Sequence, residues 1–154
     1  MYSTIDSVKN KMALRTLLEL LNDESRLDDA IDLTNPSDLI TIRFNQAASD
    51  AKEEIDPCLR ARYALPLANV PKLITAISDD ITIYNIYKRR MMDNMPESIL
   101  AMYKNTVKIR EQIQKGTLDL GIEKISDTQV NAGEFRVNKT ASSKIFNDDM
   151  WSRH

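Results

Sequence analysis

The sequence predicts an all-α fold: a small bundle of about four helices with a long central helix, followed by an extended C-terminal tail. Glycine is scarce, with 3 in 154 residues, and most of the 5 prolines stand at segment boundaries. Apolar residues recur every three or four positions as far as Lys115, and this periodicity fades from Thr117 onward. We therefore predict an α-helical domain over residues 1–116 and a docking tail over residues 117–154.

The first helical region is predicted to begin at a loose capping pair, Ser3 and Asp6, because a hydroxyl followed three residues later by an acid is typical of a helix start. Its apolar residues keep helical spacing from Ile5 to Leu21. We expect it to break near Asn22. The acidic, turn-rich stretch over residues 24–35 is typical of a surface loop.

A second helix is predicted from about Asn35, which can cap it, with Pro36 in its first turn. Its apolar stripe contains three alanines in one row, at positions 47, 48 and 51, which favours a close helix crossing. Pro57 predicts a bend or an early break, because proline removes one backbone hydrogen bond and clashes with the preceding turn. The helix is expected to close at Tyr63, before a corner stiffened by Pro66.

The third helix is predicted from about Pro71 to Arg90, with apolar residues on two faces. Burial on two sides indicates the central helix of the bundle, or a helix shared between the core and a subunit interface. A fourth helix is expected to start after Pro96 and to stop at Gly116, because glycine is the usual C-terminal stop.

The tail has isolated apolar residues and too few of them to build a core of its own. The alternation in Glu134-Phe135-Arg136-Val137 permits a short strand or hairpin on assembly. Spaced aromatic residues in a segment without a core are typical of a chain that orders when it binds a neighbour.

The residue types present exclude most catalytic chemistry. The single cysteine, Cys58, falls on the apolar stripe of the second helix, and the single histidine, His154, is the last residue. Zinc sites and Ser/His or Cys/His catalysis need more ligands or a positioned imidazole. Adjacent acids such as Asp79 and Asp80 point in different directions on a helix, so they form no acid/base pair. We therefore expect no enzyme, no catalytic residue, no cofactor and no metal.

The charge of −2 gives no overall attraction to nucleic acid. One local cluster, Lys88-Arg89-Arg90 with Arg60 and Arg62 placed nearby, could face DNA through phosphate contacts. The alternative is that these residues meet the C-terminal dipole of their own helix, with Asp79, Asp80 and Asp93 as possible partners. No apolar run approaches the about 20 residues of a membrane span, and no secretory signal opens the chain, so we expect no membrane contact.

Motifs in order along most of the chain indicate a family: Ile55-Asp56, Leu59, Arg62-Tyr63, Leu65-Pro66-Leu67, Val70-Pro71, Asp80-Ile81, Tyr84, Tyr87, Tyr103, Gly116, Leu120 and the closing Ser143-Lys144-Ile145-Phe146-Asn147-Asp148-Asp149-Met150. In these residues and their spacing the chain resembles small structural proteins of Mu-like phages and prophages, of the head-to-tail adaptor, connector or neck type. It departs from them in lacking a glycine after the first short helix and in having Pro57.

The resemblance implies a virion structural protein that forms a ring beneath the portal, extends the DNA channel and links head to tail. The implied partners are further copies in a dodecameric ring, the portal protein, the next neck or tail protein, and DNA passing through the channel. The implied location is the neck of the virion, after assembly in the cytoplasm of the bacterial host.

Two sets of residues are candidate contacts with other subunits or the portal: Arg62, Tyr63, Leu65 and Pro66 at the corner, and Phe135, Val137, Phe146 and Trp151 in the tail. At the corner, the structural alternative is that Tyr63 and Leu65 plug the end of the bundle while Arg62 forms a salt bridge or caps carbonyls. The functional alternatives are a DNA-binding packaging accessory or regulator, and another neck component such as a tail terminator or completion protein.

Overall fold

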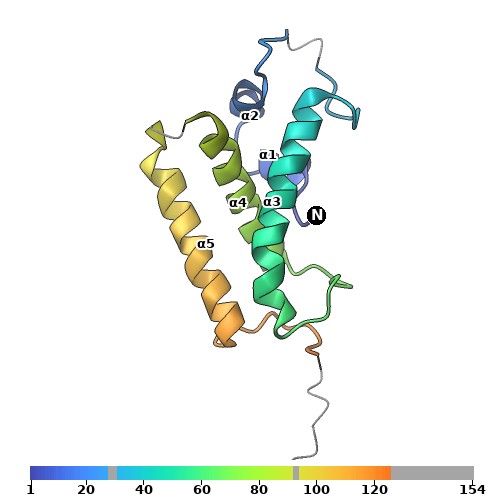
Figure 1. Ribbon diagram of the computed structural model, residues 1–154, viewed down its shortest axis with the longest axis vertical. Helices are drawn as coiled ribbons and strands as arrows, with labels where there is room; N and C mark the ends of the chain where they lie inside the picture. The colour runs from blue at the N-terminus through green and yellow to red at the C-terminus, as the bar shows by residue number, and fades with distance from the viewer. Residues whose placement is uncertain (28–30, 92–93, 126–154) are drawn as a thin grey trace, which may run out of the picture.

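A computed structural model of the protein describes residues 1–27, 31–91 and 94–125. These residues form five helices and no strand: α1 (Ile5–Lys9), α2 (Leu14–Leu21), α3 (Leu39–Arg60), α4 (Lys72–Arg90) and α5 (Glu97–Lys115) (Figure 1). The prediction of an all-α helical bundle is therefore confirmed.

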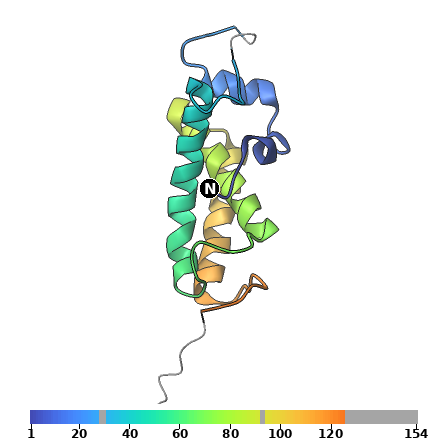
Figure 2. The same ribbon diagram turned by 90° about the vertical axis from the view of Figure 1, so that its right-hand side faces the viewer.

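Helices α3, α4 and α5 run side by side and alternate in direction, while α1 and α2 pack beside α4 and α3 near one end (Figures 1 and 2). Helix α4 contacts every other helix of the described residues. Apolar side chains on its two faces, including Ile77 and Ile86, are almost fully buried. The prediction of a central helix is confirmed.

The core divides into two clusters along the bundle. The cluster near α2 contains Leu17, Leu21, Phe44 and Ile86, and the cluster at the opposite end contains Leu59, Tyr63, Ile74 and Ile113, among others. The alanine row of α3 is buried between them, and the Asn85 amide of α4 donates a hydrogen bond to the Ala47 carbonyl over 3.3 Å. A side chain of α4 therefore reaches the backbone of α3, as a close crossing requires.

Helix α5 is attached by polar and aromatic contacts in addition to apolar side chains such as Ile113, which is buried in the second cluster. The Tyr103 ring stacks on Tyr84 of α4, with centroids 3.9 Å apart, and its hydroxyl donates to Glu54 of α3 over 3.1 Å. Arg110 pairs with the same carboxylate at 2.9 Å. Burial raises the pKa of the Tyr103 phenol, and the neighbouring Glu54 adds to that rise. Two tyrosines of the sequence resemblance therefore join α4 to α5.

The predicted first helical region is divided into two helices, α1 and α2, which meet at a turn around residues 10–13. The predicted cap at Ser3 is wrong, because Thr4 caps α1 in a reciprocal hydrogen-bonded box with Ser7. Ser3 is instead buried, and its hydroxyl donates to Ser78 of α4 over 2.6 Å. The adjacent hydroxyls of Ser3 and Thr4 thus bind different partners: Thr4 binds Ser7 within α1, and Ser3 binds Ser78 of α4.

The boundaries of α3 also differ from the prediction. Asp38 caps the helix by accepting a hydrogen bond from the Ile40 N–H, whereas Asn35 accepts from Ser37 in the preceding turn. The helix ends at Arg60 instead of Tyr63. Pro57 causes no early break, since α3 continues through it. The proline costs about 3 kcal/mol, but the flanking Ile55 and Leu59 are almost fully buried, and each contributes about 1.5–3 kcal/mol.

The predicted stop of α5 at Gly116 is confirmed: this residue has φ 76°, and its N–H bonds to carbonyls of the last turn. Beyond it, Leu118, Leu120 and Ile122 pack against the second core cluster. The described part of the chain after Gly116 is thus attached to the bundle. The division of the chain at residue 116 into domain and tail stays a prediction.

Candidate functional site

The corner between α3 and α4 closes one end of the bundle. Tyr63 is 1 % exposed and Leu65 is half-buried against the second core cluster, so both side chains plug this end. The Tyr63 hydroxyl receives a hydrogen bond from the Leu120 N–H over 3.2 Å and donates to Asp119 over 3.4 Å. Pro66 is exposed, after a cis peptide bond. The corner is therefore joined to residues 119–120 through one buried phenol.

Arg62 lies against the C-terminal end of α5. A Cβ atom added to Gly116 would be 1.9 Å from Arg62 Nη1. Among the described residues the guanidinium forms no ion pair, so neither the predicted salt bridge nor a carbonyl cap is found there. Its positive charge meets the negative end of the α5 dipole. The Arg62 carbonyl accepts a hydrogen bond from the Ile125 N–H over 2.9 Å, which joins the corner to residues 122–125.

A groove of about 630 Å³ separates the corner from the segment after α5. We call it the corner groove; it is lined by Ala64, Pro66, Leu67, Ala68 and Asn69 on one side and by residues 121–125 on the other. A smaller pocket of about 340 Å³ lies on the other side of Pro66, lined partly by Tyr2, Arg60 and Val70. Val70 and Ile125 are exposed apolar side chains beside these hollows. The corner end therefore has both the concave shape and the apolar surface of a contact site.

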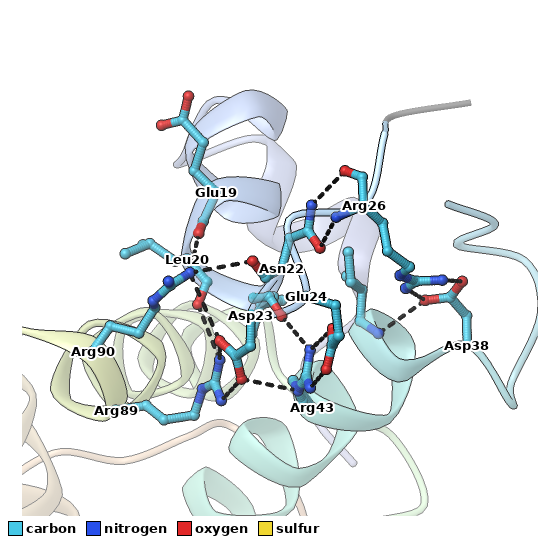
Figure 3. A network of polar contacts seen from close by, with 12 residues as sticks. Glu19, Leu20, Asn22, Asp23, Glu24, Arg26, Asp38, Arg43, Arg89 and Arg90 are labelled. Atoms are coloured by element: carbon cyan, nitrogen blue, oxygen red, sulfur yellow. Dashed lines mark hydrogen bonds and ion pairs between the residues drawn. The ribbon is translucent and has the colours of Figure 1, made fainter. Parts of the chain in front are cut away.

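The predicted basic cluster, at the end of α4, lies at the opposite end of the bundle (Figure 1), and Figure 3 shows the contacts of Arg89 and Arg90. Arg89 donates two hydrogen bonds of 2.6 Å to the Asp23 carboxylate and one of 3.2 Å to the Leu20 carbonyl. Arg90 donates to the Glu19 carbonyl over 2.6 Å. Arg43 of α3 donates to the Leu21 carbonyl over 2.7 Å and pairs with Glu24. Three arginines from α3 and α4 therefore bind the C-terminal end of α2.

The arginines bind here because the last carbonyls of α2 have no hydrogen-bond partner within that helix. The last turn of α2 contains no basic residue of its own, so cations from other helices satisfy its carbonyls and its dipole. The Arg89 guanidinium holds the pKa of Asp23 below its ordinary value, and Arg43 does the same for Glu24. The basic residues at this end are thus largely engaged within the molecule.

The predicted grouping of Lys88-Arg89-Arg90 with Arg60 and Arg62 is wrong. Because α3 and α4 are antiparallel, the end of α4 lies beside the start of α3, and Arg60 and Arg62 lie at the other end. The predicted acidic partners also differ: Asp79 accepts from Ser7 and Asp80 pairs with Lys11, both on the α1 side. Lys88 is exposed and lines a pocket of about 370 Å³ with Arg43 and Asn85.

An ion pair between Arg26 and Asp38 was not anticipated from the sequence. The guanidinium contacts both carboxylate oxygens, at 2.7 and 3.1 Å, while Asn22 exchanges two hydrogen bonds with the Arg26 backbone (Figure 3). Asp38 also caps α3, and the Arg26 guanidinium together with the Ile40 N–H holds its pKa far below the ordinary value. The pair ties the loop after α2 to the start of α3. Beside it, Leu27 and Ile42 are exposed.

This pair predicts a loss of stability in acid. A carboxyl whose pKa is lowered by folding contributes stability above its unfolded value of about 3.9, and that contribution is lost as the pH falls below it. The midpoint of urea unfolding is expected to drop between pH 7 and pH 3, and Asp38→Asn should reduce that drop. Asp6→Asn is the control, because Asp6 is exposed and pairs with Lys9 of the same helix. An equal acid dependence in Asp38→Asn and the parent chain would contradict the prediction.

The remaining candidate contacts, Phe135, Val137, Phe146 and Trp151, lie outside the described residues, as does the predicted strand or hairpin. In the part of the chain that is described, no three His, Cys, Asp or Glu side chains gather as a metal site would require. Within the same residues, none of the helices combines the length and apolar character needed to cross a membrane.

Comparison with known proteins identifies the family of this chain. Residues 2–139 match the model of the family described as "Bacteriophage Mu, Gp36". The "Gene product J" of Escherichia phage Mu is 30% identical over 122 residues, which cover 79% of this chain and 77% of that protein. The "Mu-like prophage FluMu protein gp36" of Haemophilus influenzae is 25% identical over 130 residues, 83% of this chain and 81% of the relative. The chain therefore belongs to the bacteriophage Mu Gp36 family.

Proposed function

We propose that this protein is a structural head-tail connector of a tailed bacteriophage. In this proposal it forms a ring beneath the portal, extends the DNA channel and links head to tail. The observation that carries the proposal is a helical bundle with exposed apolar side chains at both of its ends. One end has the corner groove with Val70 and Ile125 exposed, and the other has Leu27 and Ile42 exposed beside the Arg26–Asp38 pair. A protein that joins two neighbours needs two such surfaces.

The proposed partners are further copies of the chain in a dodecameric ring, the portal protein, and the next neck or tail protein. Identical subunits that meet through two different surfaces form a heterologous contact, which closes into a ring when the rotation per subunit is suitable. The proposed location is the neck of the virion. A reconstruction of the assembled neck tests the whole proposal: density for this chain anywhere but directly under the portal would contradict it.

Each end of the bundle is expected to be needed separately. Val70→Asp and Leu27→Asp should each reduce joining of the protein to portal-bearing heads or to the next neck protein by about tenfold or more, because a charge in an apolar contact removes at least 1.4 kcal/mol. Both side chains are exposed, so stability should change by only about 0.5 kcal/mol. Lys104→Asp on the exposed side of α5 is the control. Unimpaired joining by both variants would contradict the two-surface arrangement.

The alternative function, a DNA-binding packaging accessory or regulator, depends on Lys88, Arg89 and Arg90. Because Arg89 and Arg90 are engaged with Asp23 and with carbonyls of α2, we expect weak DNA binding by the free protein. Lys88→Ala should lower the slope of log affinity against log salt by about 1 at most. A titration at two salt concentrations measures this. Tight, steeply salt-dependent binding that Lys88→Ala and Arg89→Ala both abolish would favour the alternative.

A further inference from the structure

The corner groove has unpaired backbone on both of its sides. Among the described residues, residues 64–70 take part in no backbone hydrogen bond. On the opposite side, the Ile125 N–H bonds to Arg62, whereas residues 122–124 form no backbone hydrogen bond. The described residues contain no sheet edge to which a strand could be added, but an extended peptide in this hollow can pair its backbone with these N–H and C=O groups and place apolar side chains in the hollow.

The two sides of the groove are held at a definite separation. The Tyr63 hydroxyl receives the Leu120 N–H, the Gly121 N–H bonds to Asp119 over 3.0 Å, and Lys124 pairs with Asp119. The Lys124 ammonium and the Gly121 N–H hold the pKa of Asp119 below its ordinary value. Because both sides of the groove are already ordered, binding of a peptide does not incur the entropy cost of ordering them.

We propose that the corner groove binds the segment Glu134-Phe135-Arg136-Val137 of a neighbouring copy in extended form. This inference rests on the proposed function, in which copies of the chain lie side by side. Alternation in the segment puts Phe135 and Val137 on one face of a strand, where they would meet Leu67 and Ile122 of the groove. The other face holds Glu134 and Arg136. Glu123 at the rim is exposed and forms no ion pair among the described residues, so it is available to Arg136.

The connecting chain is long enough for a second copy to be the source of this segment. Ile125 lies on the rim of the groove, and residues 126–133 precede the segment. Eight residues in extended form span roughly 26–29 Å. Neighbouring helices lie about 8–10 Å apart, and α3, α4 and α5 all contact one another, so the bundle is two helices, or about 20 Å, across. The segment can therefore extend from the groove of one copy to the groove of the next.

A cross-linking experiment between two different full-length variants tests the proposal. Both contain Cys58→Ser; one copy also contains Ala68→Cys in the groove, and a differently tagged copy contains Glu134→Cys. At about 1 mM of each, where even a millimolar contact is well populated, a short bismaleimide should join the two copies. Phe135→Ser with Val137→Ser in the second copy should reduce the mixed product at least tenfold. Lys104→Cys in place of Ala68→Cys is the matched control.

Each of the following three outcomes would overturn the inference. No mixed product above the Lys104→Cys control would exclude binding of this segment in the groove. A mixed product that does not depend on Phe135 and Val137 would exclude insertion of these two side chains into the groove. A third variant contains both cysteines in one chain. If this variant cross-links within itself at high dilution, while no mixed product forms at about 1 mM, the groove binds the tail of its own copy. The neck reconstruction is a separate measurement, so failure of the cross-linking test leaves the connector proposal standing.

Discussion

Tyr63→Ala is expected to lower the free energy of unfolding by about 3–5 kcal/mol, which is the usual cost of deleting a buried aromatic side chain. The ring is 1 % exposed and packs in the cluster that joins the ends of α3, α4 and α5. Its loss leaves a cavity at the corner and removes the phenol that holds Leu120 and Asp119. Urea unfolding followed by circular dichroism measures the change.

Tyr63→Phe separates the two roles of this residue. The variant keeps the ring but loses the hydroxyl contacts to Leu120 and Asp119, so a cost of about 0.5–1.5 kcal/mol is expected. Hydrogen exchange should become faster at the amides of residues 120–125 and remain unchanged in α3 and α4. A cost equal to that of Tyr63→Ala would show that the hydroxyl, not the ring, closes this end of the bundle.

Gly116→Ala is expected to destabilise the protein by about 1–2 kcal/mol from the backbone conformation alone, because a side chain is unfavourable at φ 76°. The added Cβ would also lie 1.9 Å from Arg62 Nη1, so the guanidinium must leave the end of α5. The total cost should therefore exceed that of the conformation alone. Thermal unfolding of the variant checks this.

Gly121→Ala is the matched control for this substitution. Gly121 also has a positive φ, 68°, but an added Cβ would meet no atom within 4 Å. Its cost should be the conformational one only. In the Arg62→Ala background, Gly116→Ala should then cost about as much as Gly121→Ala. Equal costs for the two glycines in the parent chain would mean that Arg62 moves aside freely and does not fix the junction after α5.

The candidate contact surfaces were predicted only in part from the sequence. The corner was identified because prolines and a helix end stand together in residues 60–71, and its Tyr63 and Leu65 do plug the bundle. The groove beside it was not anticipated, since one of its sides comes from residues 121–125, more than fifty positions later in the chain. Nothing in the local pattern of either segment indicates that they meet.

The arginine cluster gives a second example. The sequence placed Lys88, Arg89 and Arg90 at the end of a helix, and a helix end is indeed the partner of Arg89 and Arg90. It is the end of α2, however, and not that of α4. Asp23 and Asp38, each bound to arginine, had no local signal that separated them from the other acids of residues 23–38.

The sequence by itself determined the helical class, the central place of α4, the stop at Gly116 and the membership of the phage family. The first three depend on periodicity, capping and turn geometry, which act between residues a few positions apart and can be read along the chain. The family membership rests instead on the similarity of residues along the chain. Only the tertiary structure decided which acid pairs with which arginine, that Pro57 stays within α3, and that residues 121–125 form one side of the groove. Those outcomes depend on contacts between distant segments, for which the chain offers many candidates of similar chemistry and the packing of the whole bundle selects one.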